Sequence, residues 1–300
     1  MPNTLVHLGI QGLGNRLVST RIDIKWVFLG CIIPDLPWIF RRVIIGLNPG
    51  INIYELRLYS VVQASLLFCL LLAFAFALIS ERPRFVFVIL AVNSLIHLLL
   101  DAVEIKWGNG VHLLAPLNWQ HLSLSLMWPD SLPSAVLSLF GLLVGIWFLA
   151  HPAPASIRIL FYSYGRLFTV ALLVSLYFFS PFAFLDGPYS TNINSIRTLQ
   201  EKESRVGKEV RMDRETYQQR DDGDVVITFA NEPLRVVGDI RAEKSMQISL
   251  IGEFVDVDTI KIQYLHEYHS YWRGFASYIG LGLFALVWAA ALVRERRSQQ

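Results

Sequence analysis

The chain has 300 residues, of which 54% are hydrophobic and 17% are charged, and its mean hydropathy is positive. This composition is too apolar for an ordinary soluble protein of this length and predicts an integral membrane protein. The formal net charge of +2 gives no basic field of the kind that favours nucleic-acid binding, so we expect no nucleic-acid partner.

Residues 1–40 predict a short helical hairpin rather than a pair of membrane spans. Their apolar runs, Leu5 to Leu13 and Trp26 to Ile33, are both shorter than the roughly 20 residues that cross the hydrocarbon of a bilayer. Charged residues, including Arg16 and Lys25, separate the two runs. We therefore expect two short helices that enter the membrane together, as a re-entrant hairpin does.

Five later segments predict membrane-spanning helices. Four of them reach the required length without difficulty: Leu58–Ser80, Ser134–Ala150, Leu167–Leu185 and Gly274–Val293. The fifth, Phe85–Asp101, is near the lower limit and carries His97 and Asp101 at its C-terminal end. Residues 1–186 are thus predicted to form a helical, polytopic membrane domain.

Between Asp186 and Trp272 the sequence becomes polar and β-like. Five short runs of alternating or β-branched residues are separated by turn signals, and they predict strands at Gly207–Met212, Val225–Phe229, Leu234–Val237, Met246–Ile251 and Thr259–Leu265. Five such strands favour a small all-β domain, an OB-like closed barrel, although a small sandwich has the same pattern. The predicted divisions are a linker at 187–204, the β-domain at 205–266, and a final transmembrane helix with a basic tail at 267–300.

Lysines and arginines in the short connections predict the orientation. If the C-terminal Arg294, Arg296 and Arg297 are cytoplasmic, alternation of the spans places most basic loop residues on the same side, as the positive-inside rule requires. The opposite side receives fewer of them: Arg41, Arg42, Arg57 and Lys106. Arg41 and Arg42 run against the bias. This orientation leaves the β-domain and the His97/Asp101 helix end outside the cytoplasm.

The candidate site begins with His97 and Asp101, which lie four residues apart and so share one helix face. One imidazole nitrogen and one carboxylate oxygen can then converge on a single ion. The predicted hairpin brings His7 and Asp35 to the same outer side. Ionisable groups near membrane depth are costly and usually face a bundle interior or a wet cavity, where they pair or do chemistry. Loop residues could complete the set: Glu104, His112, His121 and Asp130, of which His112 is nearest to the pair in sequence.

Each residue also has a simpler interpretation. His97 and Asp101 could form a plain hydrogen-bonded pair, and Asp35 after Pro34 could end a helix in a turn. His112 lies in a glycine-containing loop and could be an ordinary loop residue. The convergence of four ionisable groups on one side favours a metal centre over these separate explanations.

Three stretches resemble a known family: HLGIQGLGNRL from His7, GCIIPDLP from Gly30 to Pro37, and LIHLLLDAVEIKWGNGVHLLAPL from Leu95 to Leu117. Together they resemble the bacterial inner-membrane metal-dependent hydrolases, which are related to zinc-dependent phospholipase C-like proteins. The resemblance covers about the first 150 residues. It implies a multi-pass protein of the bacterial inner membrane and metal-ligand roles at matching positions: His7, Asp35, His97 and Asp101.

The resemblance fails at one motif. The family carries His-Arg-Gly-x-Thr-His-Ser before a long helix, whereas this chain has YSVVQASLL, so that Tyr59 and Ala64 stand where histidines are expected. The C-terminal β-domain also lies outside the family core. The chain therefore resembles a degenerate member with an added domain.

Two functions follow as hypotheses. In the first, a divalent ion, zinc above all, is held by His7, Asp35, His97 and Asp101, with His112 as a further ligand, and assists hydrolysis of a lipid or phosphoester. Because a catalytic zinc keeps an open position, four protein ligands would favour a structural ion unless Asp35 or Asp101 does not bind it. Such a carboxylate would orient a histidine or act as a general base. In the second, the chain is a catalytically degenerate membrane scaffold whose β-domain binds a partner protein or an envelope component. Both hypotheses place membrane lipids around the helices.

Overall fold

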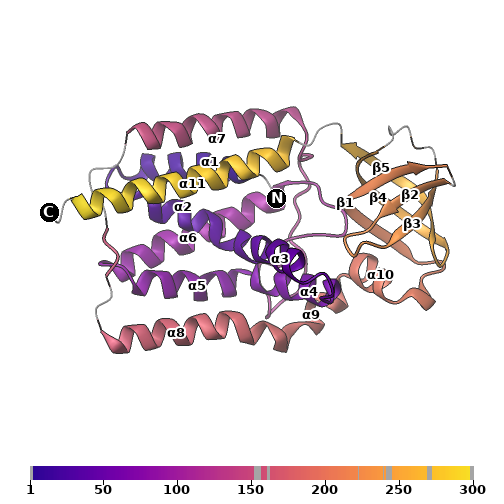
Figure 1. Ribbon diagram of the computed structural model, residues 1–300, viewed down its shortest axis with the longest axis horizontal. Coiled ribbons are helices and arrows are strands. Elements are labelled where there is room, and N and C mark those ends of the chain that lie inside the picture. The colour runs from indigo at the N-terminus through magenta and orange to yellow at the C-terminus, as the bar shows by residue number, and fades with distance from the viewer. Residues whose placement is uncertain are drawn as a thin grey trace.

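The computed structural model describes residues 3–151, 157–160, 163–221, 223–238, 240, 245–268 and 272–297. A helical bundle forms one end of the molecule and a five-stranded sheet domain forms the other (Figure 1). The C-terminal end of the last helix, α11, lies at the far end of the bundle from the sheet. Helices α3 and α4 lie between the body of the bundle and the sheet domain.

The bundle consists of α1 (Thr4–Val18), α2 (Ile24–Ile32), α3 (Leu36–Leu47), α4 (Ile53–Gln63), α5 (Leu66–Leu78), α6 (Pro83–Val103), α7 (Leu132–Ala150), α8 (Tyr164–Phe179) and α11 (Trp272–Arg297). Within the described part of the chain, α6, α7, α11 and α8 with the 3-10 turn after it are long and apolar enough to cross a membrane. The predicted helices are confirmed at these four places, and the composition is consistent with a membrane protein.

The predicted single span Leu58–Ser80 is wrong in one respect, because it is divided into α4 and α5. The two helices meet at an angle of 68°. Ser65 leaves the helical conformation (φ −72°, ψ 159°) and is the N-cap residue of α5, although its side chain makes no capping hydrogen bond. The break between the two helices thus falls at this serine.

Glycines let the helices around the site approach each other closely. A Cβ atom on Gly141 of α7 would overlap the carbonyl oxygen of Leu5 in α1 and lie 2.5 Å from the carbonyl carbon. A Cβ on Gly30 of α2 would lie 2.8 Å from the Cβ of Asn93 and 3.2 Å from the Cα of Leu90, both in α6. Helix α1 therefore packs directly on the backbone of α7, and α2 packs directly on α6.

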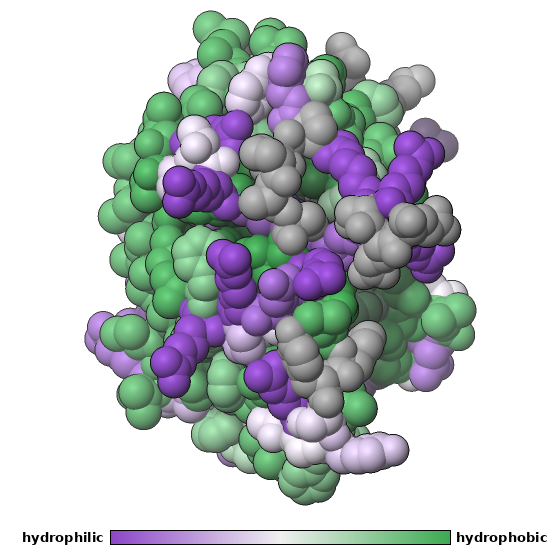
Figure 2. Space-filling view, turned by 90° about the vertical axis from the view of Figure 1, so that its left-hand side faces the viewer, coloured by the Kyte–Doolittle hydropathy of each residue, from purple (hydrophilic) through white to green (hydrophobic). Residues whose placement is uncertain are grey.

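The flanks of the bundle are apolar. Large hydrophobic side chains such as Leu143 of α7, Phe168 of α8 and Leu286 of α11 are more than half exposed. From the end opposite the sheet domain, hydrophilic residues gather at the centre of the face and hydrophobic residues surround them (Figure 2). A polar end and apolar flanks are the pattern expected of helices with lipid contacts.

The sheet domain consists of β1 (Glu209–Arg220), β2 (Gly223–Ile227), β3 (Pro233–Val237), β4 (Ser245–Asp256) and β5 (Thr259–Tyr268). The strands pair in the order β1-β2-β3-β5-β4, and β4 pairs back with β1, which closes the ladder. Strands β3 and β5 are parallel and the other pairs are antiparallel. The five predicted strands are confirmed, and their buried side chains, among them Tyr217, Leu250 and Phe254, form the core.

Residues 187–204, predicted as a linker, are helical and packed. They contain most of α9 (Asp186–Thr191), a π-helical turn at Ile193–Arg197, α10 (Thr198–Gln200) and a 3-10 turn at Lys202–Ser204. Leu199 is 1% exposed and belongs to the core of the sheet domain. The polar composition of this segment predicted a linker because only a few apolar side chains, such as Leu199, attach it to the sheet domain.

Candidate metal centre

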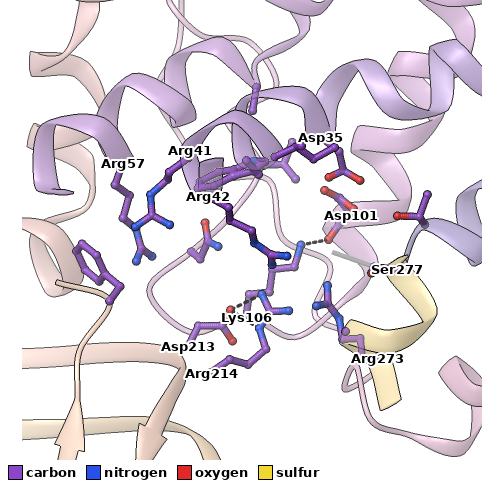
Figure 3. Close-up of a pocket in the computed structure, with 18 of the residues that line it drawn as sticks. Asp35, Arg41, Arg42, Arg57, Asp101, Lys106, Asp213, Arg214, Arg273 and Ser277 are labelled. Atoms are coloured by element: carbon purple, nitrogen blue, oxygen red, sulfur yellow. Dashed lines mark hydrogen bonds and ion pairs between the residues drawn. The ribbon is translucent and has the colours of Figure 1, made fainter. Parts of the chain in front are cut away.

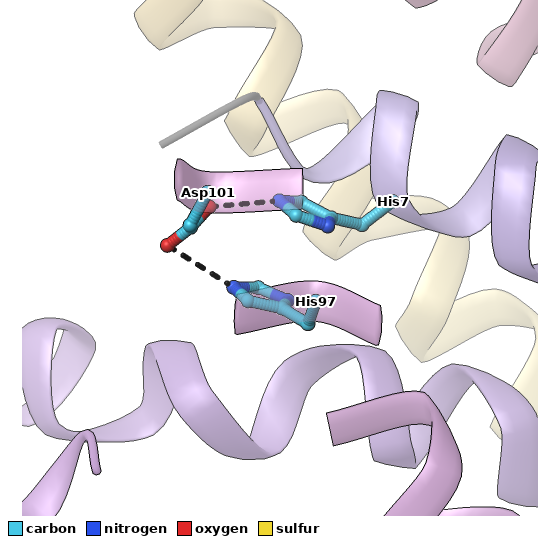
Figure 4. Close-up of side chains that lie close together, drawn as sticks. All are labelled: His7, His97 and Asp101. Carbon is cyan, nitrogen blue, oxygen red and sulfur yellow. Dashed lines mark ion pairs between the residues drawn. The ribbon is translucent and has the colours of Figure 1, made fainter. Parts of the chain in front are cut away.

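His7 of α1 meets His97 and Asp101 of α6 in the interior of the bundle (Figure 4). The Nε2 atom of His7 lies 3.3 Å from one carboxylate oxygen of Asp101, and the Nε2 atom of His97 lies 3.7 Å from the other. The two imidazole rings are stacked with their centroids 3.7 Å apart. The side chains of both histidines are 0% exposed and that of Asp101 is 2% exposed. A carboxylate is thus shared by two buried imidazoles.

The backbone of α2 fixes the orientation of the His97 ring. Its Nδ1 atom lies 2.5 Å from the carbonyl oxygen of Cys31. Because a carbonyl oxygen can only accept, Nδ1 carries the hydrogen, and a neutral His97 presents the lone pair of Nε2 on its other side. Nε2 faces Asp101 at 3.7 Å and Asp35 at 3.7 Å. Two carboxylates facing this nitrogen favour a positive charge between them, either a proton or a metal ion.

The same atoms fit a metal ion. In the described part of the chain, His7 Nε2, His97 Nε2 and Asp101 Oδ1 are buried without a hydrogen-bond partner. One ligand atom from each of the three residues lies within 4.8 Å of the others. A tetrahedral zinc ion bound at its usual distances separates its ligand atoms by about 3.3 Å, which is the spacing of His7 and Asp101, whereas His97 lies 3.7 Å from Asp101. Two nitrogens and one oxygen leave a coordination position open, as catalytic sites do.

Asp35 extends this centre toward a cavity. It ends the 3-10 turn Ile33–Asp35 that joins α2 to α3, and its side chain is 14% exposed, more than that of Asp101. Of the five predicted metal ligands, the structure brings His7, His97 and Asp101 into one group, and Asp35 adjoins it through His97.

His112, the fifth predicted ligand, does not converge with the others. Its Nδ1 atom lies 2.8 Å from the carbonyl oxygen of Trp119, and its Nε2 atom lies 3.4 Å from the side-chain nitrogen of Asn192. Burial, reinforced by the neighbouring His121, lowers the pKa of His112 to about 4. His112 is therefore neutral at physiological pH and held by contacts with Trp119 in its own loop and with Asn192 after α9. Asp130 is likewise paired elsewhere, with His266 at 3.0 Å.

The cavity beside the centre has a volume of about 650 Å³ and is lined by Asp35 and Asp101. Six basic side chains also line it: Arg41, Arg42, Arg57, Lys106, Arg214 and Arg273. Figure 3 shows Arg41, Arg42 and Arg57 reaching from the helices into the space that Arg214 and Arg273 approach from other elements. We did not predict these residues as a site. One indication of this site was present in the sequence: the predicted orientation places Arg41 and Arg42 on the side of the membrane that the positive-inside rule expects to be poor in basic residues.

The two positions that depart from the family motif have different surroundings. Tyr59 donates its hydroxyl to the carbonyl oxygen of Phe178 at 2.8 Å and accepts from Gln63 at 2.9 Å. Ala64 lines the cavity. Tyr59 is therefore held against α8, and Ala64 contributes only a methyl group to the cavity wall.

Gly30→Ala is expected to weaken metal binding without removing a ligand. The added methyl group would push α2 away from Asn93 and Leu90 of α6, and with it the Cys31 carbonyl that orients His97. We expect zinc affinity to fall by about ten-fold, the smaller end of the range for loss of a group that orients a ligand. The measurement is competition with a chromophoric chelator. Gly46→Ala, at a position with no atom within 4 Å of the added Cβ, is the control and should bind zinc normally.

Glu215 of β1 lines the same cavity and gives the protein a testable pH dependence. Burial raises the pKa of this carboxyl from 4.5 to about 7, although Arg57 and Arg41 oppose the shift and Asp213 adds to it. The folded chain then retains a proton that the unfolded chain has lost, so the stabilising effect of protonation disappears as pH rises from 4.5 through 7. We expect Glu215→Gln to remove this decline and to gain about 3 kcal/mol over the wild type between pH 4.5 and pH 8. Thermal unfolding in detergent at the two pH values measures it, and parallel curves for both proteins would contradict it.

Comparison of the chain with protein-family models, with curated proteins and with solved structures found no match.

Proposed function

We propose that this protein is a metal-dependent hydrolase of the membrane that cleaves a lipid or phosphoester substrate. The observation that carries the proposal is the group of three buried side chains, His7, His97 and Asp101, whose ligand atoms lie within 4.8 Å of one another beside a basic cavity. The resemblance of the segments around these residues to bacterial inner-membrane hydrolases supports it. A purely structural pair of histidines would not need a wet, charged cavity at its side.

The chemistry follows from the donor set. A divalent ion such as zinc, when bound, would supply Lewis-acid polarisation of a phosphoryl or acyl oxygen and would make water more acidic. His7, His97 and Asp101 would hold it. Asp35 lies 3.7 Å from His97 and is exposed to the cavity, so it can accept a proton from water as a general base. The carbonyl of Cys31 keeps His97 in the required orientation.

The proposal includes a location. We place the helices in the bacterial inner membrane, with the last residues of α11 in the cytoplasm and the sheet domain, as an OB-like barrel, on the outer side. The arginines at the end of α11 and the closed ladder of five strands support these assignments. The metal centre then lies at the outer end of α6, within reach of lipid head groups.

Elemental analysis and a hydrolysis assay test the proposal together. Purified, chelator-washed protein is incubated with zinc or manganese, desalted, and assayed for bound metal and for cleavage of chromogenic phosphoesters and phospholipids. We expect one ion per chain in the wild type and none in His97→Ala/Asp101→Ala. His151→Ala, at an exposed histidine after α7, is the matched control and should retain metal and activity. A wild-type protein that binds no metal, and whose activity a chelator does not change, would refute the proposal.

One observation favours a second function. Tyr59 and Ala64 occupy the positions of the family's two other histidines, so the chain could be a degenerate scaffold whose sheet domain binds a partner protein or an envelope component. That function predicts bound metal without cleavage of any ester in the same assay. It also predicts that Tyr59→His/Ala64→His does not diminish the binding of a protein partner to the sheet domain.

A further inference from the structure

The basic cavity contains arginines that the protein itself does not neutralise. Among the described residues, Arg41, Arg57 and Arg273 have no carboxylate within 4.0 Å and no hydrogen bond from their side chains. The Nε atoms of Arg41 and Arg273 are buried and unpartnered. Arg57 lies over the ring of Phe229, with its guanidinium carbon 4.0 Å from the centroid. Three guanidinium groups from three helices thus line one space.

The carboxylates that line the cavity have other partners. Asp213 pairs with Arg214 at 2.9 Å, and Asp130 pairs with His266 at 3.0 Å. Asp35 and Asp101 belong to the metal centre. Glu215 is the remaining acid among the lining residues, and burial raises its pKa to about 7, so it carries only part of a negative charge at neutral pH.

Positive charges that line the same cavity repel each other. Burial, followed by the charge of the neighbouring Arg57, lowers the pKa of Arg41 to about 10. Removing a cation from water without a partner costs several kcal/mol, and a second cation nearby adds to that cost. The unpaired arginines therefore lower the stability of the folded protein, and an anion that contacts them would restore it.

We propose that the cavity binds a phosphate group, free or as the head group of a phospholipid, through Arg41, Arg57 and Arg273. Guanidinium forks match the oxygens of phosphate in pairs, and three of them from different directions can contact more oxygens than a carboxylate offers. Sulfate shares this geometry and serves as a competitor in the test. The inference that the cavity binds the phosphate of the substrate rests on the proposed hydrolase function. The inference that the cavity binds an anion does not depend on that function.

The remaining lining explains why a lipid fits the volume. A cavity of about 650 Å³ is larger than one phosphate needs, and Trp38, Phe275 and Leu281 add apolar surface to its wall. Phe275 of α11 is 69% exposed, on a helix long and apolar enough to lie among lipids. Arg42 of α3 contacts the hydroxyl of Tyr278 in α11 at 3.4 Å beside it. A phosphate at the arginines would thus have apolar side chains next to it on the side of α11.

Two experiments on the whole chain test the site. In the first, the protein in detergent is titrated calorimetrically with inorganic phosphate. In the second, its thermal unfolding is compared in nanodiscs of phosphatidate-containing and of pure phosphatidylcholine bilayers. We expect Arg41→Gln/Arg273→Gln to weaken phosphate binding by at least about ten-fold, or to abolish the stabilisation by phosphatidate, since it removes two charge-assisted contacts to the phosphate. Arg235→Gln, at an exposed arginine of β3, is the control and should behave as the wild type.

The outcomes separate the two proposals. Binding of phosphate that the double arginine variant loses supports a site for free phosphate, and stabilisation by phosphatidate that only this variant loses supports a head-group site. The arginine variant must unfold in a cooperative thermal transition like that of the wild type, which shows that the bundle is folded. Equal responses of the wild type and Arg41→Gln/Arg273→Gln in both arms would overturn the inference. His97→Ala, at a residue outside the cavity lining, should keep phosphate binding, so failure of the hydrolase proposal leaves this result intact.

Discussion

Asp101→Asn is expected to lower zinc affinity on the order of 100-fold or more, because it removes the one carboxylate that contacts both histidines. Asparagine keeps the size of the side chain and the helix of α6. It cannot offer an anionic oxygen to the ion, and its amide nitrogen places hydrogens where the ligand atoms converge. Competition with a chelator of known affinity measures the loss, and hydrolysis should fall with it.

Asp130→Asn is the matched control for this variant. Asp130 also lines the cavity, but its carboxylate pairs with His266 at 3.0 Å instead of joining the metal centre. We expect its zinc affinity to remain within a factor of about 2 of the wild type, since a carboxylate away from the ion changes only the long-range field. Equal losses in the two variants would show that the effect comes from the charge of the cavity, and would contradict Asp101 as a ligand.

Gly141→Ala is expected to destabilise the folded protein by about 3 kcal/mol, at the upper end of the usual cost of overpacking. The added methyl group would meet backbone atoms of Leu5, which cannot move aside as a flexible side chain can. Helix α1 would have to separate from α7 and would carry His7 away from Asp101. Thermal unfolding in detergent should show a lower midpoint, and elemental analysis should show less bound metal.

Gly14→Ala, in α1, provides the opposite expectation. No atom lies within 4 Å of a Cβ at this position, and α1 is helical on both sides of it. Alanine should therefore stabilise the protein by about 0.5–1 kcal/mol through its greater helix propensity. If Gly141→Ala proved as stable as Gly14→Ala, the close approach of α1 and α7 would be wrong.

The elements of this fold were predictable because each carries a local signal. Long apolar runs predicted α6, α7, α8 and α11, and alternating runs predicted the five strands. The bend at Ser65 was not predicted, because hydropathy averaged over a window does not register one capping residue. Helix α3 was not predicted as a separate helix either. It begins directly after Pro34 and Asp35, which in the sequence indicate the end of the predicted hairpin.

The site was predictable only in part, for a related reason. The spacing of His97 and Asp101 is fixed by helix geometry, and the hairpin brings in His7. The orientation of His97 by the carbonyl of Cys31 depends on the contact of Gly30 with α6, which no local pattern reports. The arginine cavity collects side chains from three helices, a loop and a strand, and only the folded chain places them together.

During synthesis the ribosome delivers His7, His97 and Asp101 well before Arg273, which stands at the beginning of the last helix. A nascent chain that ends after α6 already contains all three side chains of the metal centre. The cavity is completed only after β5 has closed the strand ladder and α11 has joined α1. All three candidate ligands are thus present in the chain before Arg273, the last basic residue that lines the cavity, has been made.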